Sequence, residues 1–301
     1  MFGPTQFRST QLPLELFIKT RIGEIKKIEL SQEIPSDLRA ESTIGMYHEM
    51  PPAEIVGIAS QYGIRHLVQD RQPYSQSDVQ TAEIMMTRLE HFLSFPSSSI
   101  LSAGLSGPEQ ENSLIKLSVH FSRADEKAGV INQVKDELAK LKRSQHFVSE
   151  VLLAADELFS NAIYNAPYLG FSHKDGGVPR TKKFGNDPRI RPARLFLASD
   201  GVRLVLGCED SYGSLNPDIV IDRIKTCLHE GADNAIRWTA GGAGLGTYMI
   251  LRSALAYYVG VLRNQRTVVC CTYTVARSKV DSVRGLHFAC KGDRAPSDPF
   301  P

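Results

Sequence analysis

The chain has 301 residues, about two average domains, and its 35 Lys and Arg nearly balance its 33 Asp and Glu. A formal net charge of +2 argues against a nucleic-acid-binding face over the whole chain, and 42% hydrophobic residues exclude collagen-like and disordered classes. Five cysteines without CxxC spacing favour reduced thiols over disulfides or a zinc site. Without a long apolar run or a secretory signal, we expect a soluble, cytoplasmic protein that binds neither membrane nor nucleic acid.

Residues 1–94 alternate between strand and helix patterns and predict a small α+β domain, whose role the sequence does not indicate. His48 and His66 have no partners at metal-ligand spacing, so we expect ordinary surface or half-buried histidines. The predicted elements are strands at 14–19, 22–30 and 64–68, a helix at 53–62 that ends at Gly63, and a helix at 77–93.

Residues 95–112 are rich in Ser, Gly and Pro and predict a linker to a second domain at 113–290, followed by a tail at 291–301. For the second domain we predict a mixed, mostly antiparallel sheet with helices on one face, a two-layer α/β sandwich of the α+β class. Its predicted elements are strands at 114–121, 194–197, 202–207, 257–262, 267–275 and 286–289, the last three antiparallel, and helices at 124–141, 144–164, 217–229 and after 246.

A glycine-rich run, Gly241–Gly246, precedes the last of these helices. Glycines let backbone amides approach a ligand, and a helix N-terminus favours an anionic phosphate. By itself the run is also explained by a plain loop. It is neither a P-loop, since no Lys-Ser/Thr pair follows, nor a dinucleotide fingerprint, since no strand of a βαβ unit precedes it.

Two further motifs carry polar side chains at defined positions. Glu157 and Asn161 lie four residues apart on the predicted helix 144–164 and so share one face, where they can polarise a water and hold Mg²⁺ through oxygen. Asp210 ends an apolar strand, where a carboxylate can accept a hydrogen bond from an exocyclic amino group at the bottom of a pocket. The alternatives are a solvated polar stripe for the pair and a turn-favouring aspartate for Asp210.

In this order and spacing, the three motifs resemble the sequence boxes of the GHKL superfamily of ATP-binding domains, over roughly residues 113–290. The resemblance implies the Bergerat-type ATP-binding fold, with ATP and Mg²⁺ as cofactors. The matching residues are Glu157 and Asn161 in the N-box, Asp210 and Gly213 in the first glycine box, Gly242, Gly244 and Gly246 in the second, and Thr267 for a threonine near the phosphates.

The resemblance also implies a role for each matching residue. Asn161 is expected to coordinate the Mg²⁺ that bridges the phosphates, Asp210 to bind the adenine amino group, and Glu157 to be the general base if ATP is turned over. Asn165 is expected to line the same pocket. The backbone amides of Gly242, Gly244, Leu245 and Gly246 are expected to cradle the phosphates, with residues 231–241 as a mobile lid.

The chain departs from the family pattern in two places. Tyr212 stands where the first glycine box has its first glycine, so a side chain lies where the family has bare backbone. Residues 167–192 are an insertion rich in Lys and Arg, which is either a partner-docking or anion-binding loop or a solvated one.

Within the superfamily, the Glu-x-x-x-Asn-Ala-Ile run at 157–163 is most similar to the anti-sigma-factor and partner-switching serine kinases. We do not expect a histidine kinase, because no phosphoaccepting helical hairpin is recognised before residue 114, nor a relative of DNA gyrase or MutL, in which a transducer domain follows the ATP site. The resemblance implies a regulatory protein that binds Mg-ATP and a protein partner, a sigma-factor-like or antagonist regulator. It is either a protein serine/threonine kinase or, alternatively, a non-catalytic nucleotide-gated binding module or a degenerate scaffold. The oligomeric state stays open, a homodimer included.

Overall fold

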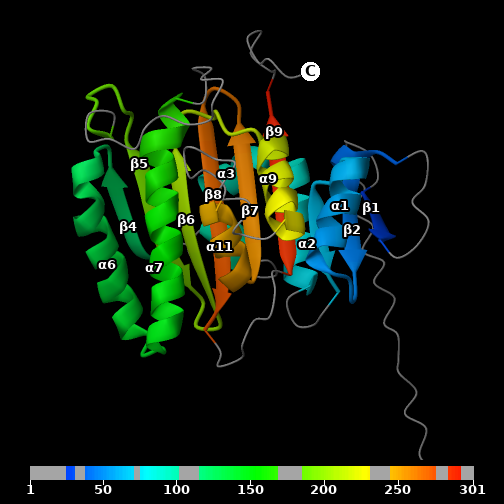
Figure 1. Cartoon of the computed structure of the whole chain (residues 1–301), viewed down its shortest axis with the longest axis horizontal. Helices are drawn as coiled ribbons and strands as arrows, with labels where there is room; N and C mark the ends of the chain where they lie inside the picture. Colours follow the sequence, from blue (N-terminus) through cyan, green and yellow to red (C-terminus); the bar gives the residue numbers. More distant parts are fainter. Residues whose placement is uncertain are drawn as a thin grey trace, which may run out of the picture.

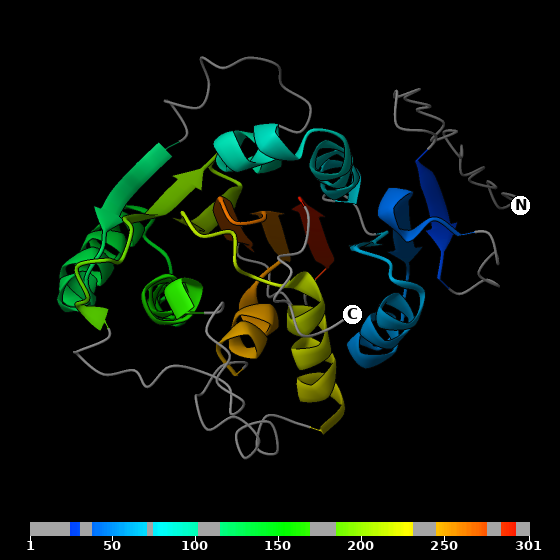
Figure 2. The ribbon, with the colours of Figure 1, turned by 90° about the horizontal axis from the view of Figure 1, so that it is seen from above.

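The described part of the chain folds into one mixed sheet with helices on both faces (Figure 1, Figure 2). The sheet has nine strands in the order β1-β2-β3-β9-β7-β8-β6-β5-β4. The predicted α+β class and the mixed character of the sheet are therefore confirmed. The structure is a computed structural model, and it describes residues 25–30, 38–70, 75–101, 115–168, 185–230, 245–275 and 284–292.

Strands from the second half of the chain form the larger part of the sheet. β5 and β6 are the predicted hairpin, and Gly201 takes the turn with a φ of +88°. The last strand, β9, was expected to run antiparallel to its neighbours but lies parallel to β7. β8 already has β6 and β7 as its two neighbours, so β9 takes the free edge of β7. β7 and β8 are antiparallel, and a strand that runs opposite to β8 is therefore parallel to β7. These strands are β4 (Ile115–Phe121), β5 (Ala193–Ser199), β6 (Arg203–Asp210), β7 (Ala256–Leu262), β8 (Arg266–Thr274) and β9 (Gly285–Lys291).

One face of the sheet carries a row of helices in the order α6, α7, α11, α9 and α1 (Figure 1). α7 begins at Ser144, whose hydroxyl accepts a hydrogen bond from the Phe147 amide at 3.2 Å, the contact expected of an N-cap. Phe159 of α7 stacks on Phe121 of β4, with ring centroids 4.2 Å apart. The helices are α1 (Pro52–Tyr62), α6 (Lys127–Lys140), α7 (Gln145–Ser160), α9 (Pro217–Glu230) and α11 (Leu245–Ser253).

The opposite face is covered by α2 (Ser75–Thr87), α3 (Leu89–Ser94) and α4 (Pro96–Leu101) (Figure 2). The predicted helix 77–93 is interrupted at Arg88 and becomes α2 and α3. The expectation of helices on one face only is corrected, because β5, β6 and β8 are buried on both faces and each apolar face needs a cover.

The two predicted domains share this sheet. β1 (Lys26–Glu29), β2 (Thr43–Tyr47) and β3 (His66–Gln69) run parallel to one another, and β3 pairs antiparallel with β9, which places His66 opposite His287. His66 is 2% exposed and so more buried than expected. Helix α4 lies inside the predicted linker 95–112. The domain boundaries themselves stay predictions, since a shared sheet does not show where one folding unit ends.

In the part of the chain that the structure describes, no helix is both long and apolar enough to cross a membrane.

Candidate functional site

The sequence motifs lie around one end of the sheet, where β6 ends beside the C-terminal end of α7. Asp210 is the last residue of β6, and Thr267 of β8 lies directly opposite it. Leu206 and Cys208 pack into the core beneath α7, so the two-residue period of the strand places the Asp210 side chain on the same face. The two polar side chains therefore face the helix that carries Glu157 and Asn161.

Asp210 is a half-buried carboxylate held by its own turn. Its Oδ1 accepts a hydrogen bond from the Tyr212 amide at 2.9 Å. Burial raises the pKa of Asp210 to about 6, because loss of solvent outweighs the stabilising hydrogen bonds from the Tyr212 and Gly213 amides.

Thr267 is the unsatisfied partner in this pair. Its side chain is 1% exposed, and it lies near enough to Asp210 to favour the ionised carboxylate. Its hydroxyl nevertheless makes no hydrogen bond of normal geometry within the part of the chain described. A buried hydroxyl without such a bond requires an explanation, and a bound ligand or water is an ordinary one.

Gly213 holds the turn that follows Asp210. Its φ is +60°, and a Cβ at this position would lie 2.1 Å from the Leu262 carbonyl oxygen. The Gly213 carbonyl accepts a hydrogen bond from the Asn264 amide at 3.2 Å, which joins the turn to the β7–β8 hairpin. Only glycine fits both the backbone conformation and the space.

The sequence predicts an α-helix through residue 164, but the chain after α7 continues as a π-helical turn. Residues Asn161–Asn165 form a π-helical turn, a feature often found at functional sites. Within it, Asn165 Nδ2 donates to Asn161 Oδ1 at 2.6 Å. This bond fixes the Asn161 amide and leaves the second lone pair of its oxygen for a cation.

The start of α11 lies directly against Glu157. A Cβ on Gly246 would be only 2.0 Å from Glu157 Cδ, so the absence of a side chain at 246 is what permits this approach. Tyr257 of β7 lies in the same region: its pKa is raised mainly by burial and then by Cys271, with a smaller contribution from the Glu157 charge. Gly242, Gly244 and the expected lid 231–241 lie outside the described residues; Leu245 is the first residue of α11.

Two contacts at the site were not foreseen. Ser214 Oγ donates to the Ala166 carbonyl at 2.7 Å and joins the turn after β6 to the end of the π-helical turn. The Arg191 amide donates to the Tyr212 hydroxyl at 2.6 Å, and the Arg191 guanidinium lies over the Tyr212 ring, 5.4 Å from its centroid. Arg191 also donates to the Ser211 carbonyl at 2.8 Å. No local pattern could reveal a partner about twenty residues away.

Together these elements place an acceptor carboxylate beside a buried hydroxyl, near an oriented amide oxygen and a helix N-terminus that lies against a second carboxylate. A helix N-terminus of this kind attracts anions, and the half-buried acceptor suits a ligand that donates a hydrogen bond. Among the described residues, no three His, Cys, Asp or Glu side chains converge as metal ligands. A cation here would thus need oxygens of its ligand besides that of Asn161. No family model, curated protein or solved structure matches the chain.

Proposed function

We propose that this chain is a cytoplasmic regulatory ATP-binding protein of the GHKL superfamily, which binds Mg-ATP and a protein partner. The site lies between α7, α11, the end of β6 and the start of β8. The observation that carries the proposal is the pair of Asp210, whose carboxyl pKa is raised, and Thr267, whose buried hydroxyl makes no hydrogen bond of normal geometry among the described residues. Asp210 stands at the position that the family uses for the adenine amino group.

The residues present fit the proposed ligand. Asp210 accepts a hydrogen bond from the adenine amino group, and the Thr267 hydroxyl finds its missing partner at the ligand. Asn161 holds Mg²⁺ through its amide oxygen, while the amides at the start of α11 bind phosphate. The Bergerat-type fold belongs to the same proposal and is supported by the neighbouring strands β4, β5, β6, β8 and β7 beneath α6, α7, α11 and α9.

ATP would supply a transferable phosphoryl group. Glu157 is the carboxylate placed to take the proton of an attacking hydroxyl, since its side chain lies at the start of α11. These residues support a protein serine/threonine kinase. The protein partner is a sigma-factor-like or antagonist regulator, and the acceptor serine or threonine belongs to that partner.

The second candidate function is a nucleotide-gated binding module without phosphoryl transfer. The contact between Arg191 and Tyr212 favours it, because it holds a side chain beside Asp210 where the family has bare backbone. Incubation with ATP labelled at the terminal phosphate separates the two candidates. Labelled protein or released labelled phosphate that disappears in Glu157→Gln supports phosphoryl transfer, and tight binding with neither supports the module.

Isothermal titration of Mg-ATP into the full chain tests both. We expect saturable binding, weakened about tenfold or more by Asn161→Ala or Asp210→Asn, because a lost charge-assisted hydrogen bond or metal ligand costs about 1.5–3 kcal/mol. Asn132→Ala and Asp136→Asn on the exposed side of α6 are matched controls and should bind like the unaltered chain. Absence of binding to the unaltered chain contradicts the proposal and leaves the degenerate scaffold.

A further inference from the structure

Helix α9 is connected directly to the Asp210 turn. Only residues 211–216 separate Asp210 from the helix, and Asn216 caps it, with Oδ1 accepting from the Asp218 amide at 3.0 Å. Ser214 in this short segment is bonded to the Ala166 carbonyl. The position of α9 therefore sets where residues 211–216 end, and the amides of Tyr212 and Gly213 within this segment bond the Asp210 carboxylate.

The N-terminal part of the chain contacts the same first turns of α9. Arg65, just after α1, forms an ion pair with Asp218 at the start of α9, and Ser60 of α1 donates to Asp222 at 3.5 Å. The Arg65 carbonyl accepts from the Phe288 amide at 2.9 Å, so its backbone is anchored to β9. Arg65 thus connects a fixed point of the sheet to the first turn of α9.

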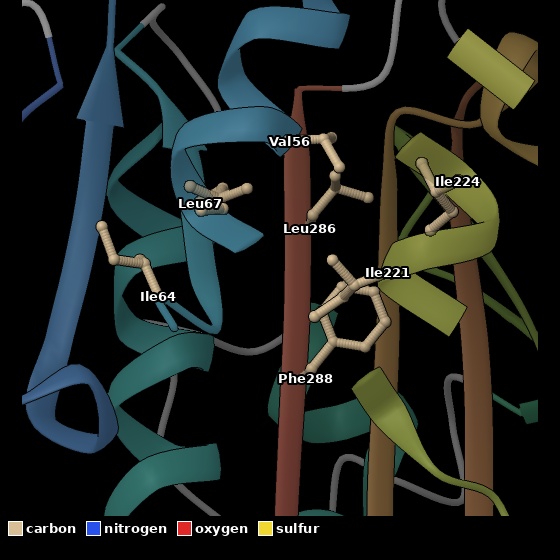
Figure 3. Close-up of a pocket in the computed structure, with 8 residues that line it drawn as sticks. Val56, Ile64, Leu67, Ile221, Ile224, Leu286 and Phe288 are labelled. Carbon is tan, nitrogen blue, oxygen red and sulfur yellow. The ribbon is translucent and has the colours of Figure 1, made fainter. Parts of the chain in front are cut away.

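Below this polar contact, α1 and α9 are packed imperfectly. A cavity of about 10 Å³ lies between them, lined only by apolar side chains, which include Val56, Leu67, Ile221 and Leu286 (Figure 3). A space of this size without polar partners does not hold a stable water, so it is a dry packing defect. The apolar contacts between α1 and α9 are incomplete at this point, and the ion pair at the start of α9 adds a directional contact between them.

We infer that Arg65 is a positioning residue of the nucleotide site, and that the N-terminal part of the chain sets nucleotide affinity through Asp218 and α9. The inference rests on the proposed function. Without the ion pair, α9 and residues 211–216 populate other positions, and the fraction of molecules that present Asp210 correctly falls. By reciprocity, bound nucleotide holds α1 more firmly against α9.

The test compares the Mg-ATP dissociation constants of the full chain and its variants by isothermal titration. Arg65→Met and Asp218→Asn should each weaken binding roughly fivefold, and the double variant should be no weaker than Arg65→Met alone. Arg65→Lys should bind nearly as the unaltered chain, because the contact uses one guanidinium nitrogen and a charge can replace it.

The matched control is Glu90→Gln, which removes the ion pair of Glu90 with Lys291. That pair also joins the N-terminal part to β9, but through α3 and not through α9. Its variant should bind Mg-ATP like the unaltered chain. An effect as large as that of Arg65→Met would show general loosening and overturn the inference.

A second readout requires no variant. Mg-ATP should slow amide hydrogen exchange in α1 of the unaltered chain and should not do so in Arg65→Met. Unaltered exchange in α1, or unaltered affinity in Arg65→Met, overturns the inference and leaves the proposed function standing. If the unaltered chain does not bind Mg-ATP, the proposed function is wrong, and the inference falls with it.

Discussion

At the scale of single residues, Asp210 and Asp78 show why burial alone does not identify a site. Burial raises the pKa of each carboxyl to about 6. Asp78, however, accepts a hydrogen bond from the Tyr258 hydroxyl at 2.8 Å, so its neighbour is satisfied within the protein. The neighbour of Asp210 is Thr267, whose hydroxyl makes no hydrogen bond of normal geometry among the described residues. What distinguishes Asp210 from Asp78 as a candidate ligand site is this neighbour together with the sequence motifs that lie around it.

Asp210→Asn should therefore stabilise the protein above pH 6 while it weakens Mg-ATP binding. The folded pKa near 6 exceeds the ordinary 3.8, so the unaltered chain loses stability as pH rises from about 4 to 6, and the loss stays constant above that. The variant lacks this loss and should be about 1–3 kcal/mol more stable at pH 7. Urea unfolding at pH 4 and pH 7 measures it; an equal difference at both pH values would contradict the assignment.

Gly213→Ala should destabilise the protein by about 2–4 kcal/mol, because both the positive φ and the Leu262 carbonyl exclude a Cβ. Gly201→Ala is the matched control. Gly201 also has a positive φ but nothing within 4 Å of its Cβ position, so only the backbone strain of about 1 kcal/mol applies. Thermal and urea unfolding of both variants check the order, and a Gly213 variant no less stable than the Gly201 variant would be the contrary result.

At the scale of elements, the close approach of α11 to α7 depends on one missing side chain. Gly246 lies in the first turn of α11, and Glu157 lies near the end of α7. Glycine is a poor helix former, so its presence in a helix requires a reason. A Cβ at 246 would lie 2.0 Å from Glu157 Cδ, far inside van der Waals contact, and this supplies the reason.

The effect of Gly246→Ala on the free energy of unfolding should accordingly change sign between the unaltered chain and a Glu157→Ala background. In the unaltered chain the added methyl displaces Glu157 or α11 and should destabilise the protein by about 1 kcal/mol or more. In Glu157→Ala the obstacle is gone, and the higher helix propensity of alanine should stabilise by up to about 1 kcal/mol. Urea unfolding of the four proteins in this cycle is the measurement. The same effect in both backgrounds would mean that the two residues are not in contact.

At the scale of the whole molecule, the apolar underside of the sheet is covered from the N-terminal part. Phe196, Val205 and Tyr258 belong to a core cluster completed by Phe92 and Ile100 of α3 and α4. Arg203 of β6 donates to the Leu101 carbonyl at 2.8 Å and to Ser77 at 2.7 Å. The sheet and the helices beneath it therefore depend on each other.

A fragment that begins at residue 113 should consequently fail to fold as a stable monomer. It keeps the proposed site but exposes the underside of β5–β8 and the free edge of β9, a contiguous apolar surface that favours aggregation. Size-exclusion chromatography and thermal unfolding of the fragment, beside the full chain, are the measurements. A monomeric fragment with a cooperative transition would show instead that the predicted boundary near 95–112 separates independent units.

The sequence was sufficient wherever the determining contact is local. The predicted helices begin near Ser144 and end at Gly63, and the predicted strands on either side of Gly201 are joined by a turn there; the structure adds that Ser144 caps α7 and that Gly63 is left-handed with φ +69°. Each depends on residues within one turn of the chain, so pattern and residue type determine them. The positions of Glu157, Asn161, Asp210 and Thr267 at one end of the sheet agree with the order of the motifs, while the nucleotide that they are proposed to bind stays a prediction.

Only the tertiary structure decided the features that depend on distant partners. The burial of His66 opposite His287, the parallel pairing of β9 with β7 and the contact of Arg191 with Tyr212 join segments between about twenty and more than two hundred residues apart. Local propensity is the same whichever partner is chosen, because the choice depends on which faces and edges remain to be covered. The sequence by itself thus determined the elements and the candidate residues, and the packing of both sheet faces determined how the N-terminal part joins them.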